Sequence, residues 1–285
     1  MGAVFGPQLF FLGFTGAGVT ISGGHETMIN NAWFGQFLYS DSRKENGTAS
    51  TATGIQIFGN DHYVTNTIVF SSKIGVDIRN PANILTGVHT WNLAAGNGGT
   101  GIIVRSSQNR LIGCYLDYNN LVIESPISAV SIEDAFFLVG SLELRTTSNN
   151  AKIDSLSIFD NQFWAGSNNK PTLILNETAG KFTSVSNMFV KNNQFSSGWS
   201  PKSPRASKTL TQKNSNKFTF DFSDILLFDN IDINWIQYSV QVNDDSSFVS
   251  SVVRKPNGKT VIIELDKSVD ATVYVTVDQS NNYDN

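Results

Sequence analysis

The phrase Gly54-Ile55-Gln56-Ile57 returns along the chain as Gly75-Val76-Asp77-Ile78 and as Gly101-Ile102-Ile103-Val104. An earlier copy is Gly18-Val19-Thr20-Ile21, and weaker copies without glycine lie at residues 121–123, 142–144 and 173–175. The copies are about 20 to 36 residues apart, and a repeat of that period is typical of a solenoid of stacked units. Within each copy the side chains alternate between two faces, which indicates a short β-strand rather than a helix.

Two further sets of short apolar segments lie between the repeated phrases, joined by Asn, Gly and Ser. Three short strands in each repeat predict an all-β fold, a right-handed parallel β-helix whose rungs pair at about 4.8 Å. A β-sandwich also uses many short strands, but it would need hairpin turns between them. The Asn-Gly pair with strands close on both sides, Asn257-Gly258, lies outside the repeats.

The chain divides into three parts by composition and pattern. Residues 1–198 hold the repeats and are predicted to form the β-helix, residues 199–208 are a Pro, Ser and basic linker, and residues 209–285 form an antiparallel β module. The module prediction rests on strict alternation at residues 217–222 and 272–277 and on a hairpin signal at residues 256–259. We expect the module to cover the open end of the helix, because that end is an exposed sheet edge.

The bulk properties exclude several classes of protein. A net charge of −4 gives no basic footprint for nucleic acid, and the composition is too apolar for a disordered chain. Residues 1–12 lack the features of a signal peptide and are interrupted by Gly and Pro, so they predict neither a leader nor a membrane span. They are typical of strand sequence, and we therefore expect that the chain is truncated at its N-terminus. Two inserts, residues 39–53 and 94–100, break the even spacing of the repeats.

Three sequence features concern covalent chemistry. The single cysteine, Cys114, excludes an intrachain disulfide and is predicted to be a buried, unreactive thiol. Two glycosylation signals, at Asn46 and Asn176, matter only in a secreted chain. The three histidines lack metal-ligand spacing, so we predict no metal site and no cofactor.

Alignment of the rungs predicts which outward side chains stack. One column has two interpretations, a ladder of surface ion pairs or a cationic strip that binds the carboxylates of an acidic polymer. Its members are Phe58, Arg79, Arg105, Glu124, Arg145 and Asn176. A second column is aromatic and can either stack on sugar rings or pack beneath an insert or the module. Its members are Trp33, His89, Tyr115 and Phe136.

The geometry of a glycosidase site limits which carboxylates could act as its acid and base. An inverting glycosidase needs an acid and a base about 6.5–9.5 Å apart, which corresponds to one or two rungs. Asp77 has no carboxylate partner in its column, so Asp61 and Asp117 remain and would have to meet across loops. Each of them is also compatible with a simple role as a turn cap.

Several stretches resemble a known family. These are residues 23–29, 59–65, 82–92, 114–118 and 274–279. They are similar to plant polygalacturonases of the QUARTET3 type, in the wider pectate-lyase superfamily of β-helices. The resemblance implies a secreted protein of the plant cell wall that acts on homogalacturonan, the acidic backbone of pectin. The helix lacks the Asn-Thr-Asp, Asp-Asp, Gly-His-Gly and Arg-Ile-Lys motifs of ordinary polygalacturonases, and its only Asp-Asp pair, Asp244-Asp245, is in the module.

The sequence therefore supports a polygalacturonase-type glycosidase, although the missing motifs leave the enzymatic assignment open. Its acid and base candidates are Asp61 and Asp117, supported by His62 or His89, and the predicted substrate-binding residues are Arg79, Arg105, Arg145, Trp91 and Tyr115. A non-catalytic pectin-binding wall protein is the alternative, and a lyase is a third possibility. The expected partner is an acidic polysaccharide, without nucleic acid or membrane, and the expected state is a monomer.

Overall fold

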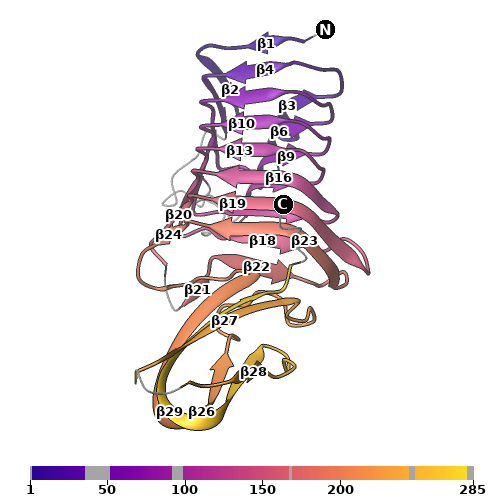
Figure 1. Ribbon diagram of the computed structural model, residues 1–285. Coiled ribbons are helices and arrows are strands. Elements are labelled where there is room, and N and C mark those ends of the chain that lie inside the picture. The colour runs from indigo at the N-terminus through magenta and orange to yellow at the C-terminus, as the bar shows by residue number, and fades with distance from the viewer. Residues whose placement is uncertain (1, 36–51, 92–98, 167–168, 244–247, 281–285) are drawn as a thin grey trace.

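The computed structural model describes residues 2–35, 52–91, 99–166, 169–243 and 248–280. Within these ranges the chain forms strands and no helix. Three parallel sheets run along the stack of coils, two of eight strands and one of seven, because the last coil contributes no strand to the third sheet (Figure 1). We call these sheets A, B and C. The coils stack from the N-terminus at the top of Figure 1 to a separate antiparallel unit at the bottom. The predicted right-handed parallel β-helix is confirmed.

The bounds of the strands follow the repeats. Sheet A contains β1 (Val4–Phe5), β4 (Met28–Asn30), β7 (Tyr63–Thr65), β10 (Ile84–Thr86), β13 (Arg110–Ile112), β16 (Ile127–Glu133), β19 (Ala151–Phe159) and β23 (Phe182–Lys191). Sheet B contains β2 (Leu9–Leu12), β5 (Ala32–Gly35), β8 (Ile68–Phe70), β11 (His89–Trp91), β14 (Tyr115–Asp117), β17 (Phe136–Leu138), β20 (Gln162–Trp164) and β24 (Gln194–Phe195). Sheet C contains β3 (Ala17–Ile21), β6 (Thr53–Ile57), β9 (Ile74–Ile78), β12 (Thr100–Val104), β15 (Asn120–Glu124), β18 (Leu142–Arg145) and β22 (Leu173–Asn176).

A single residue with positive φ turns each coil from sheet A into sheet B. The φ angles at these positions lie between 45° and 65°, a region that Gly, Asn and Asp tolerate better than most residues. The column consists of Gln8, Asn31, Asn66, Gly87, Gly113, Asp134, Asp160 and Asn192. The backbone N–H of each bend residue before Asn192 bonds the next coil, as Asn66 does to the Thr86 carbonyl at 2.9 Å. The Asn, Asp and Gly residues between the sequence repeats are therefore the corners of the helix.

The inward side chains form one continuous apolar core. The repeated phrase contributes two residues in every coil, such as Ile55 and Ile57 in one coil and Val76 and Ile78 in the next, and these four are fully buried. Aromatic rings of neighbouring strands also stack on one another in the core, as Phe137 of β17 does on Phe163 of β20 with a centroid distance of 4.5 Å. Burial of each such side chain stabilises the fold by about 1.5–3 kcal/mol, but only when the neighbouring coils are present.

The glycines of the repeated phrase lie where adjacent coils approach most closely. A Cβ on Gly54 would be 2.6 Å from the Gly75 carbonyl oxygen, and one on Gly75 would be 2.4 Å from the Gly101 carbonyl oxygen. At Gly101 the register with β15 shifts, and the Asn119 side chain fills the space instead. From β15 onward this close approach has ended, which explains why the later copies of the phrase lack glycine.

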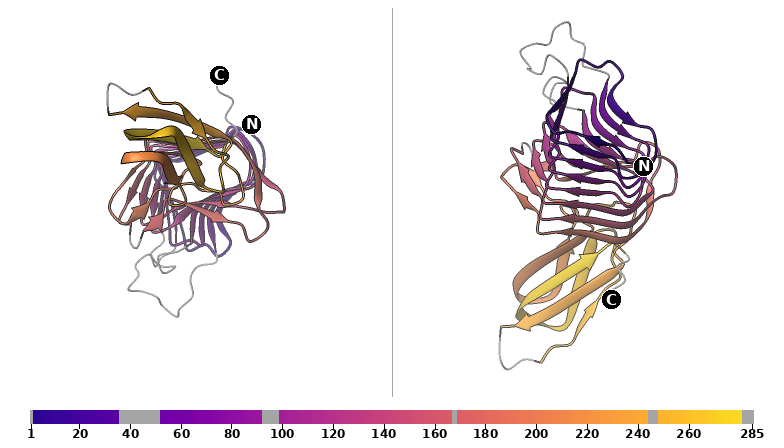
Figure 2. Two further views of the ribbon diagram at one scale, coloured as in Figure 1. Left: turned by 60° about the horizontal axis from the view of Figure 1, so that its bottom comes forward. Right: turned by 90° about the horizontal axis from the view of Figure 1, so that it is seen from above.

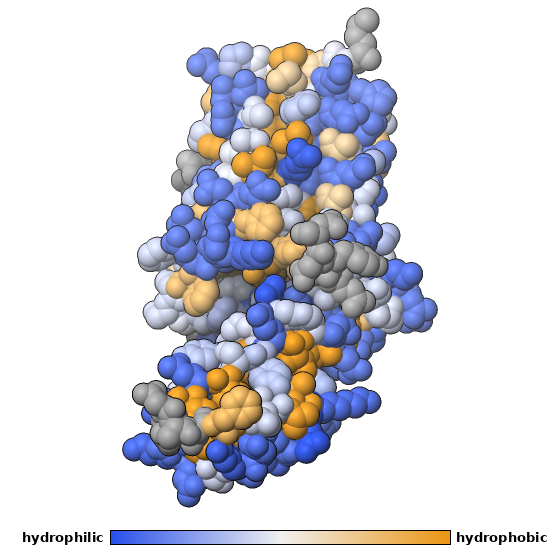
Figure 3. Space-filling model, viewed as in Figure 1, coloured by the Kyte–Doolittle hydropathy of each residue, from blue (hydrophilic) through white to orange (hydrophobic). Residues whose placement is uncertain are grey.

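The C-terminal unit is the predicted antiparallel sheet. It has the order β26 (Arg205–Asp221), β29 (Thr260–Asp278) and β27 (Trp235–Val242), with β28 (Ser251–Val253) paired to β29. In Figure 2 it is the orange and yellow unit at the end of the stack of coils. The hairpin predicted at residues 256–259 is present, with an antiparallel bridge between Asn257 and Thr260. On the face of the molecule shown in Figure 3, apolar residues lie both along the middle of the stack of coils and over the C-terminal unit, with hydrophilic residues around them.

A loop of the module covers the end of the helix, as expected. Leu227 and Phe228 belong to the core of the helix rather than to that of the module. The Phe228 ring contacts Phe182 edge-on at 6.1 Å, and Asn230 Nδ2 donates to the Phe182 carbonyl at 2.6 Å. The last coil is therefore closed by side chains that the module supplies.

The expected linker at residues 199–208 is structured instead. Trp199–Ser200 forms β25, which pairs with β21 (Lys170–Pro171), and β26 already begins at Arg205. The Trp199 ring is buried against Phe163 at 5.4 Å. The Pro and Ser composition of this segment hid one aromatic residue that completes the core. The predicted inserts at residues 39–53 and 94–100 fall mostly outside the described residues.

Replacement of Gly75 by Ala tests the close approach of the coils. The new methyl group would meet the Gly101 carbonyl at 2.4 Å, so one coil has to shift, and we expect a loss of roughly 1–3 kcal/mol in unfolding free energy. Gly16→Ala is the control, because no atom lies within 4 Å of a Cβ built there. Chemical denaturation of both variants measures the effect, and equal stability of the two would contradict the explanation.

Candidate functional site

The outer face of sheet B carries the aromatic column that the sequence predicts. Strand register places Trp33, Ile68, His89, Tyr115 and Phe136 in line. The structure adds Phe10 and Ile68 to the predicted members, and it continues the column with Gln162 and Gln194. The same register places Trp91 beside Asp117 in the neighbouring column. One face of the stacked coils thus brings together four of the residues predicted for catalysis or substrate binding.

His89, Tyr115 and Asp117 form a compact cluster on this face. The His89 ring lies flat on Tyr115, with a centroid distance of 4.3 Å and an interplanar angle of 8°. Its Nε2 lies 3.5 Å from Asp117 Oδ2, diagonally across the paired strands β11 and β14. Such stacking follows directly from parallel strands in register, because equivalent side chains of adjacent coils are only about 4.8 Å apart.

Burial sets the protonation of the cluster. The Asp117 side chain is 15% exposed, and loss of water raises its pKa above the ordinary range, an effect that His89 partly opposes. Burial lowers the pKa of His89, and Asp117 partly opposes that shift. Both shifts favour the uncharged forms. Asp117 Oδ1 is also buried without a hydrogen-bond partner in the described part of the chain. Asp117 is therefore suited to hold a proton and to donate it.

Asp61 lies at a different corner of the helix. It occupies the bend between β6 and β7 with a φ of 58°, and Asn60 and His25 bind its Oδ2 at 2.8 and 3.2 Å. The chain must cross a strand of sheet A to pass from this bend to sheet B, where Asp117 ends β14. The expected meeting of Asp61 and Asp117 across loops is therefore absent from the geometry. The reason is that the two residues follow different strands of the coil.

His62 is part of an internal ladder of polar side chains rather than of an open site. It is fully buried, and its Nδ1 accepts the Thr27 N–H at 3.0 Å. In the next coils Asn83 and Asn109 accept backbone N–H groups in the same way, from His62 and Asn83. His62 thus occupies an asparagine position, and its place directly before the sheet A strand, like that of Asn83 and Asn109, is the signal that identifies it.

The arginine column of sheet C is a ladder of ion pairs. Asp77 binds Arg79 at 2.9 Å and Arg105 at 2.8 Å, and Arg105 also binds Glu124 at 2.5 Å. Arg145 continues the ladder to Glu124 and Glu143. Three guanidinium groups thus face three carboxylates. Since Asp77 is only 1% exposed, removal of its partners would leave a buried charge, which is costly. The ion-pair interpretation of this column describes the observed contacts.

The remaining predicted features are placed as follows. Cys114 is buried as predicted, and burial raises the pKa of its thiol to about 12, which disfavours the reactive thiolate. Asn176 donates from Nδ2 to Glu143 at 2.8 Å, so a glycan on this nitrogen would displace that bond. Asn46 and Asp244-Asp245 lie outside the described residues. Among the described residues no group of three His, Cys, Asp or Glu side chains is placed to hold a metal ion.

The stacked sheets and their capping module define the class of protein, a right-handed parallel β-helix with an aromatic column and a protonatable carboxyl on one face. No family model matches the chain. Over 265 residues it is 35% identical to the polygalacturonase QRT3 of Arabidopsis thaliana, an alignment that covers 92% of this chain and 54% of that protein. The resemblance predicted from the sequence is confirmed. The chain spans about half the length of this relative.

Two solved structures of phage tailspikes are also similar. One is tailspike gp49 of the Acinetobacter baumannii bacteriophage Fri1, a capsular polysaccharide depolymerase, with a TM-score of 0.24, 10% identity and coverage of 95% of this chain and 71% of the other. The second is tailspike gp61 of the Pseudomonas phage phi297, with a TM-score of 0.22, 8% identity and coverage of 90% and 67%. In the described part of this chain no helix is long and apolar enough to cross a membrane.

Substitution of His62 by Asn tests the internal ladder. With Nδ1 accepting from Thr27, the ring N–H at Nε2 is buried without a partner in the described part of the chain, and an asparagine would remove it. We expect a gain of about 1 kcal/mol in unfolding free energy at pH 7.5. His25→Asn is the control, because His25 is exposed on the surface. A loss of stability in H62N would contradict the assignment.

The same variant has a predictable pH dependence. Burial, then His25, lowers the pKa of His62 in the folded chain, while Asp61 opposes the shift. The unfolded chain takes up the proton near pH 6.5, so it binds more protons than the folded chain just below that pH. Stability of the wild type therefore falls as the pH is lowered through about 6.5. Thermal midpoints should fall less between about pH 7.5 and 5.5 in H62N.

Proposed function

We propose that the chain acts on homogalacturonan as a glycoside hydrolase of the polygalacturonase type, with the outer face of sheet B as its working face. The observation that carries the proposal is the cluster of His89, Tyr115 and Asp117, in which a half-buried carboxyl lies beside stacked rings. The identity to a protein named polygalacturonase supports the choice of polymer. The setting that accompanies this function is the plant cell wall, with a secreted chain and an acidic polysaccharide as substrate.

Each residue of the cluster has a defined role in this proposal. Asp117 donates a proton to the glycosidic oxygen, because its raised pKa keeps the carboxyl protonated at a higher pH than usual. His89 positions that carboxyl and lies on Tyr115. Tyr115 and Trp91 offer ring faces and edges to the sugar. An inverting reaction also needs a second group of the protein, a base about 6.5–9.5 Å from Asp117, that accepts a proton from the attacking water.

The arginine ladder has a structural role in this proposal and is not part of the substrate site. Each guanidinium already binds a carboxylate of the chain, so a uronate would have to replace an existing partner of Arg79, Arg105 or Arg145. Such an exchange gains little, because one charge-assisted pair is lost for each one formed.

A second candidate function is pectin binding without turnover. Exposed aromatic side chains extend along the outer face of sheet B beyond the cluster, with Trp33 at 42% and Trp164 at 48% exposure. Such residues stack on sugar rings whether or not a bond is broken. Retained binding without product would favour this function over the first.

Product analysis on de-esterified homogalacturonan tests the two functions. We expect saturated oligogalacturonides from the wild type and a loss of about 10²–10⁴-fold in rate for Asp117→Asn, because the amide cannot donate the proton in the same way. Asp61→Asn is the matched control, since it makes the same chemical change at another corner and should keep its rate. Unsaturated products that absorb in the ultraviolet would indicate a lyase instead. Equal loss in both variants would contradict the assignment of Asp117.

The pH profile gives an independent check of the acid. A general acid works only while protonated, so kcat/KM should fall as the pH rises through the raised pKa of Asp117. His89 lowers the pKa of Asp117 through its charge, so in His89→Gln the fall in kcat/KM should occur at a higher pH. If kcat/KM falls at the same pH in H89Q and in the wild type, another group controls the profile.

A further inference from the structure

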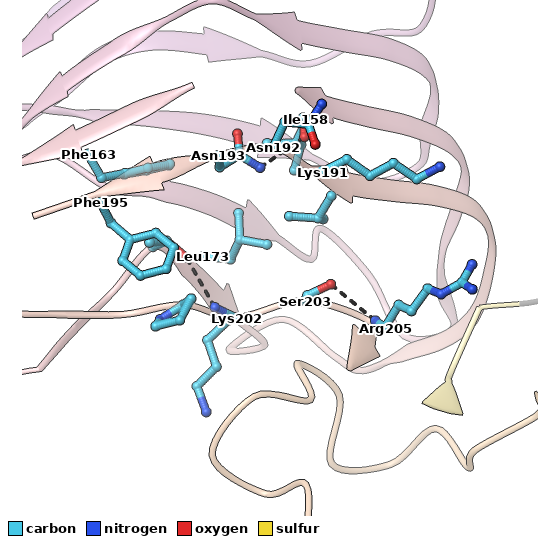
Figure 4. A pocket seen from close by; sticks show the side chains of 13 residues that line it. Ile158, Phe163, Leu173, Lys191, Asn192, Asn193, Phe195, Lys202, Ser203 and Arg205 are labelled. Carbon is cyan, nitrogen blue, oxygen red and sulfur yellow. Dashed lines mark hydrogen bonds between the residues drawn. The ribbon is translucent and has the colours of Figure 1, made fainter. Parts of the chain in front are cut away.

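The antiparallel sheet of the module has two edges that differ in their protection. One edge is β26, which begins at Arg205, beside a hollow of about 200 Å³ that residues of the last coil also line (Figure 4). In Figure 4 the Arg205 N–H is bonded to Ser203 Oγ, at 3.1 Å. The opposite edge is formed by β27, with the short β28 further along β29. An edge strand presents unpaired backbone groups, which native proteins usually protect against pairing with another chain.

The β26 edge carries devices that prevent such pairing. Lys208, Lys213 and Lys217 are spaced along it, and its register with β29 shifts on both sides of Ser215. The half-buried Lys208 also binds Asp224, with 2.7 Å between its Nζ and the Asp224 Oδ1. Charged side chains and irregular register both disfavour the addition of a further strand. The β26 edge is therefore protected.

The β27 edge lacks these devices. Its eight residues, Trp-Ile-Gln-Tyr-Ser-Val-Gln-Val over Trp235–Val242, include no charged residue and no proline, and their register with β29 is unbroken. In the part of the chain that the structure describes, no strand pairs with the other side of β27. An uncharged edge strand of this length is a template for the addition of a strand from another chain.

Hydrogen bonding decides which residues of β27 face the open edge. The Asn243 N–H donates to the Asp270 carbonyl at 2.9 Å, and the register of β27 on β29 continues from this pair. Because residues of an antiparallel ladder alternate between bonded and non-bonded pairs, the odd-numbered residues of β27 bond to β29. The backbone N–H and C=O groups of the even-numbered residues therefore point to the open edge. These are Ile236, Tyr238, Val240 and Val242.

The side chains of the same four residues are only half-buried. Ile236, Tyr238 and Val240 pack against the core of the module. In the neighbouring strand β29, by contrast, the core residues Val273 and Val275 are almost completely buried. The apolar layer of the module is thus incompletely covered at β27, and a further strand with apolar side chains on the same face would cover it.

We propose that β27 pairs antiparallel with β27 of a second copy, about a two-fold axis at Ser239. Ile236 then lies opposite Val242 of the second copy, and Tyr238 lies opposite Val240, so that all four edge residues exchange main-chain hydrogen bonds. A shift by one residue would place apolar side chains on the polar face, and a shift by two would leave one edge residue unpaired. A monomer is expected from the sequence, and the open edge favours a dimer instead. The dimer does not depend on the proposed function.

The position of β27 keeps the two stacks of coils apart in this dimer. The strand begins at the junction, where Asn234 Nδ2 donates to the Gln279 carbonyl at 2.7 Å and Gln279 Nε2 donates to the Phe228 carbonyl at 2.6 Å. Antiparallel pairing places the junction of the second copy at the other end of the paired strands. The coils of the two copies therefore lie at opposite ends of the dimer.

Two charge variants on the exposed outer face of β27 test the dimer and its register. Gln237 lies opposite Gln241 of the second copy, so Gln237→Lys/Gln241→Lys sets two pairs of like charges against each other. We expect this variant to weaken dimerisation about tenfold. Gln237→Lys/Gln241→Glu sets opposite charges against each other in both pairs and should dimerise at least as well as the wild type. Both side chains are exposed in the single chain, so the fold should be unaffected.

Thr209→Lys/Thr219→Lys is the matched control. It adds the same charge as Q237K/Q241K, at exposed positions of β26 that lie outside the proposed interface, and should dimerise like the wild type. Sedimentation equilibrium of the whole chain up to about 0.2 mM measures the association, which we expect in the micromolar range. Amide exchange followed by NMR adds a second readout. The amides of Tyr238 and Val240 should become protected as the concentration rises, whereas that of Gln237, bonded to β29, should be protected throughout.

Three results would overturn the proposal. The first is the mass of one chain over the whole concentration range. The second is equal association of Q237K/Q241K and Q237K/Q241E, which would show that a dimer forms through another surface or in another register. The third is protection of the Tyr238 and Val240 amides in the single chain, because another segment of the same chain would then occupy the edge. Failure of the chain to hydrolyse or bind pectin would leave each of these measurements unchanged.

Discussion

Backbone hydrogen bonding between successive coils is the constraint on which the rest of the structure depends. Each coil lies directly on the next, and parallel register places equivalent residues at about 4.8 Å from one another. A residue type that suits one coil therefore has to suit its neighbours. The glycines of the repeated phrase, the polar ladder that begins at His62 and the stacked rings of His89 and Tyr115 are all consequences of this spacing. No single coil can form these contacts alone.

Charges in such columns are handled in three different ways. Sheet C pairs each arginine with a carboxylate, which makes the column neutral and leaves Asp77 buried but satisfied. Sheet B holds a carboxyl without a cationic partner of comparable strength, and burial then favours the protonated acid at Asp117. At the junction with the module, aromatic rings hold Lys191 and Arg205 without cancelling their charge. Of the three, only the second arrangement lies on the proposed working face.

Much of the fold follows from the sequence because side-chain columns depend on period alone. Both outward columns were predictable in this way, and the structure adds Phe10 and Ile68 to the aromatic one. The sequence did not predict that Asp61 and Asp117 follow different strands of the coil and lie apart. Their positions depend on which corner of the coil each residue occupies, and single residues with positive φ form these corners. Trp199 was hidden by the Pro and Ser residues around it, although it completes the core. The pairing of each arginine in the column with a carboxylate depends on side-chain geometry, which the spacing of residues in the sequence does not determine.

A crystal structure of the chain with a bound oligogalacturonide would decide most directly which face is the working face. The ligand is expected on sheet B, with a sugar ring at Tyr115 and Trp91 and the glycosidic oxygen within hydrogen-bonding distance of Asp117. The salt bridges of Arg79, Arg105 and Arg145 should remain as they are in the free chain. A ligand that instead lies along sheet C, with its carboxylates in place of Asp77 and Glu124, would contradict the assignment of the site.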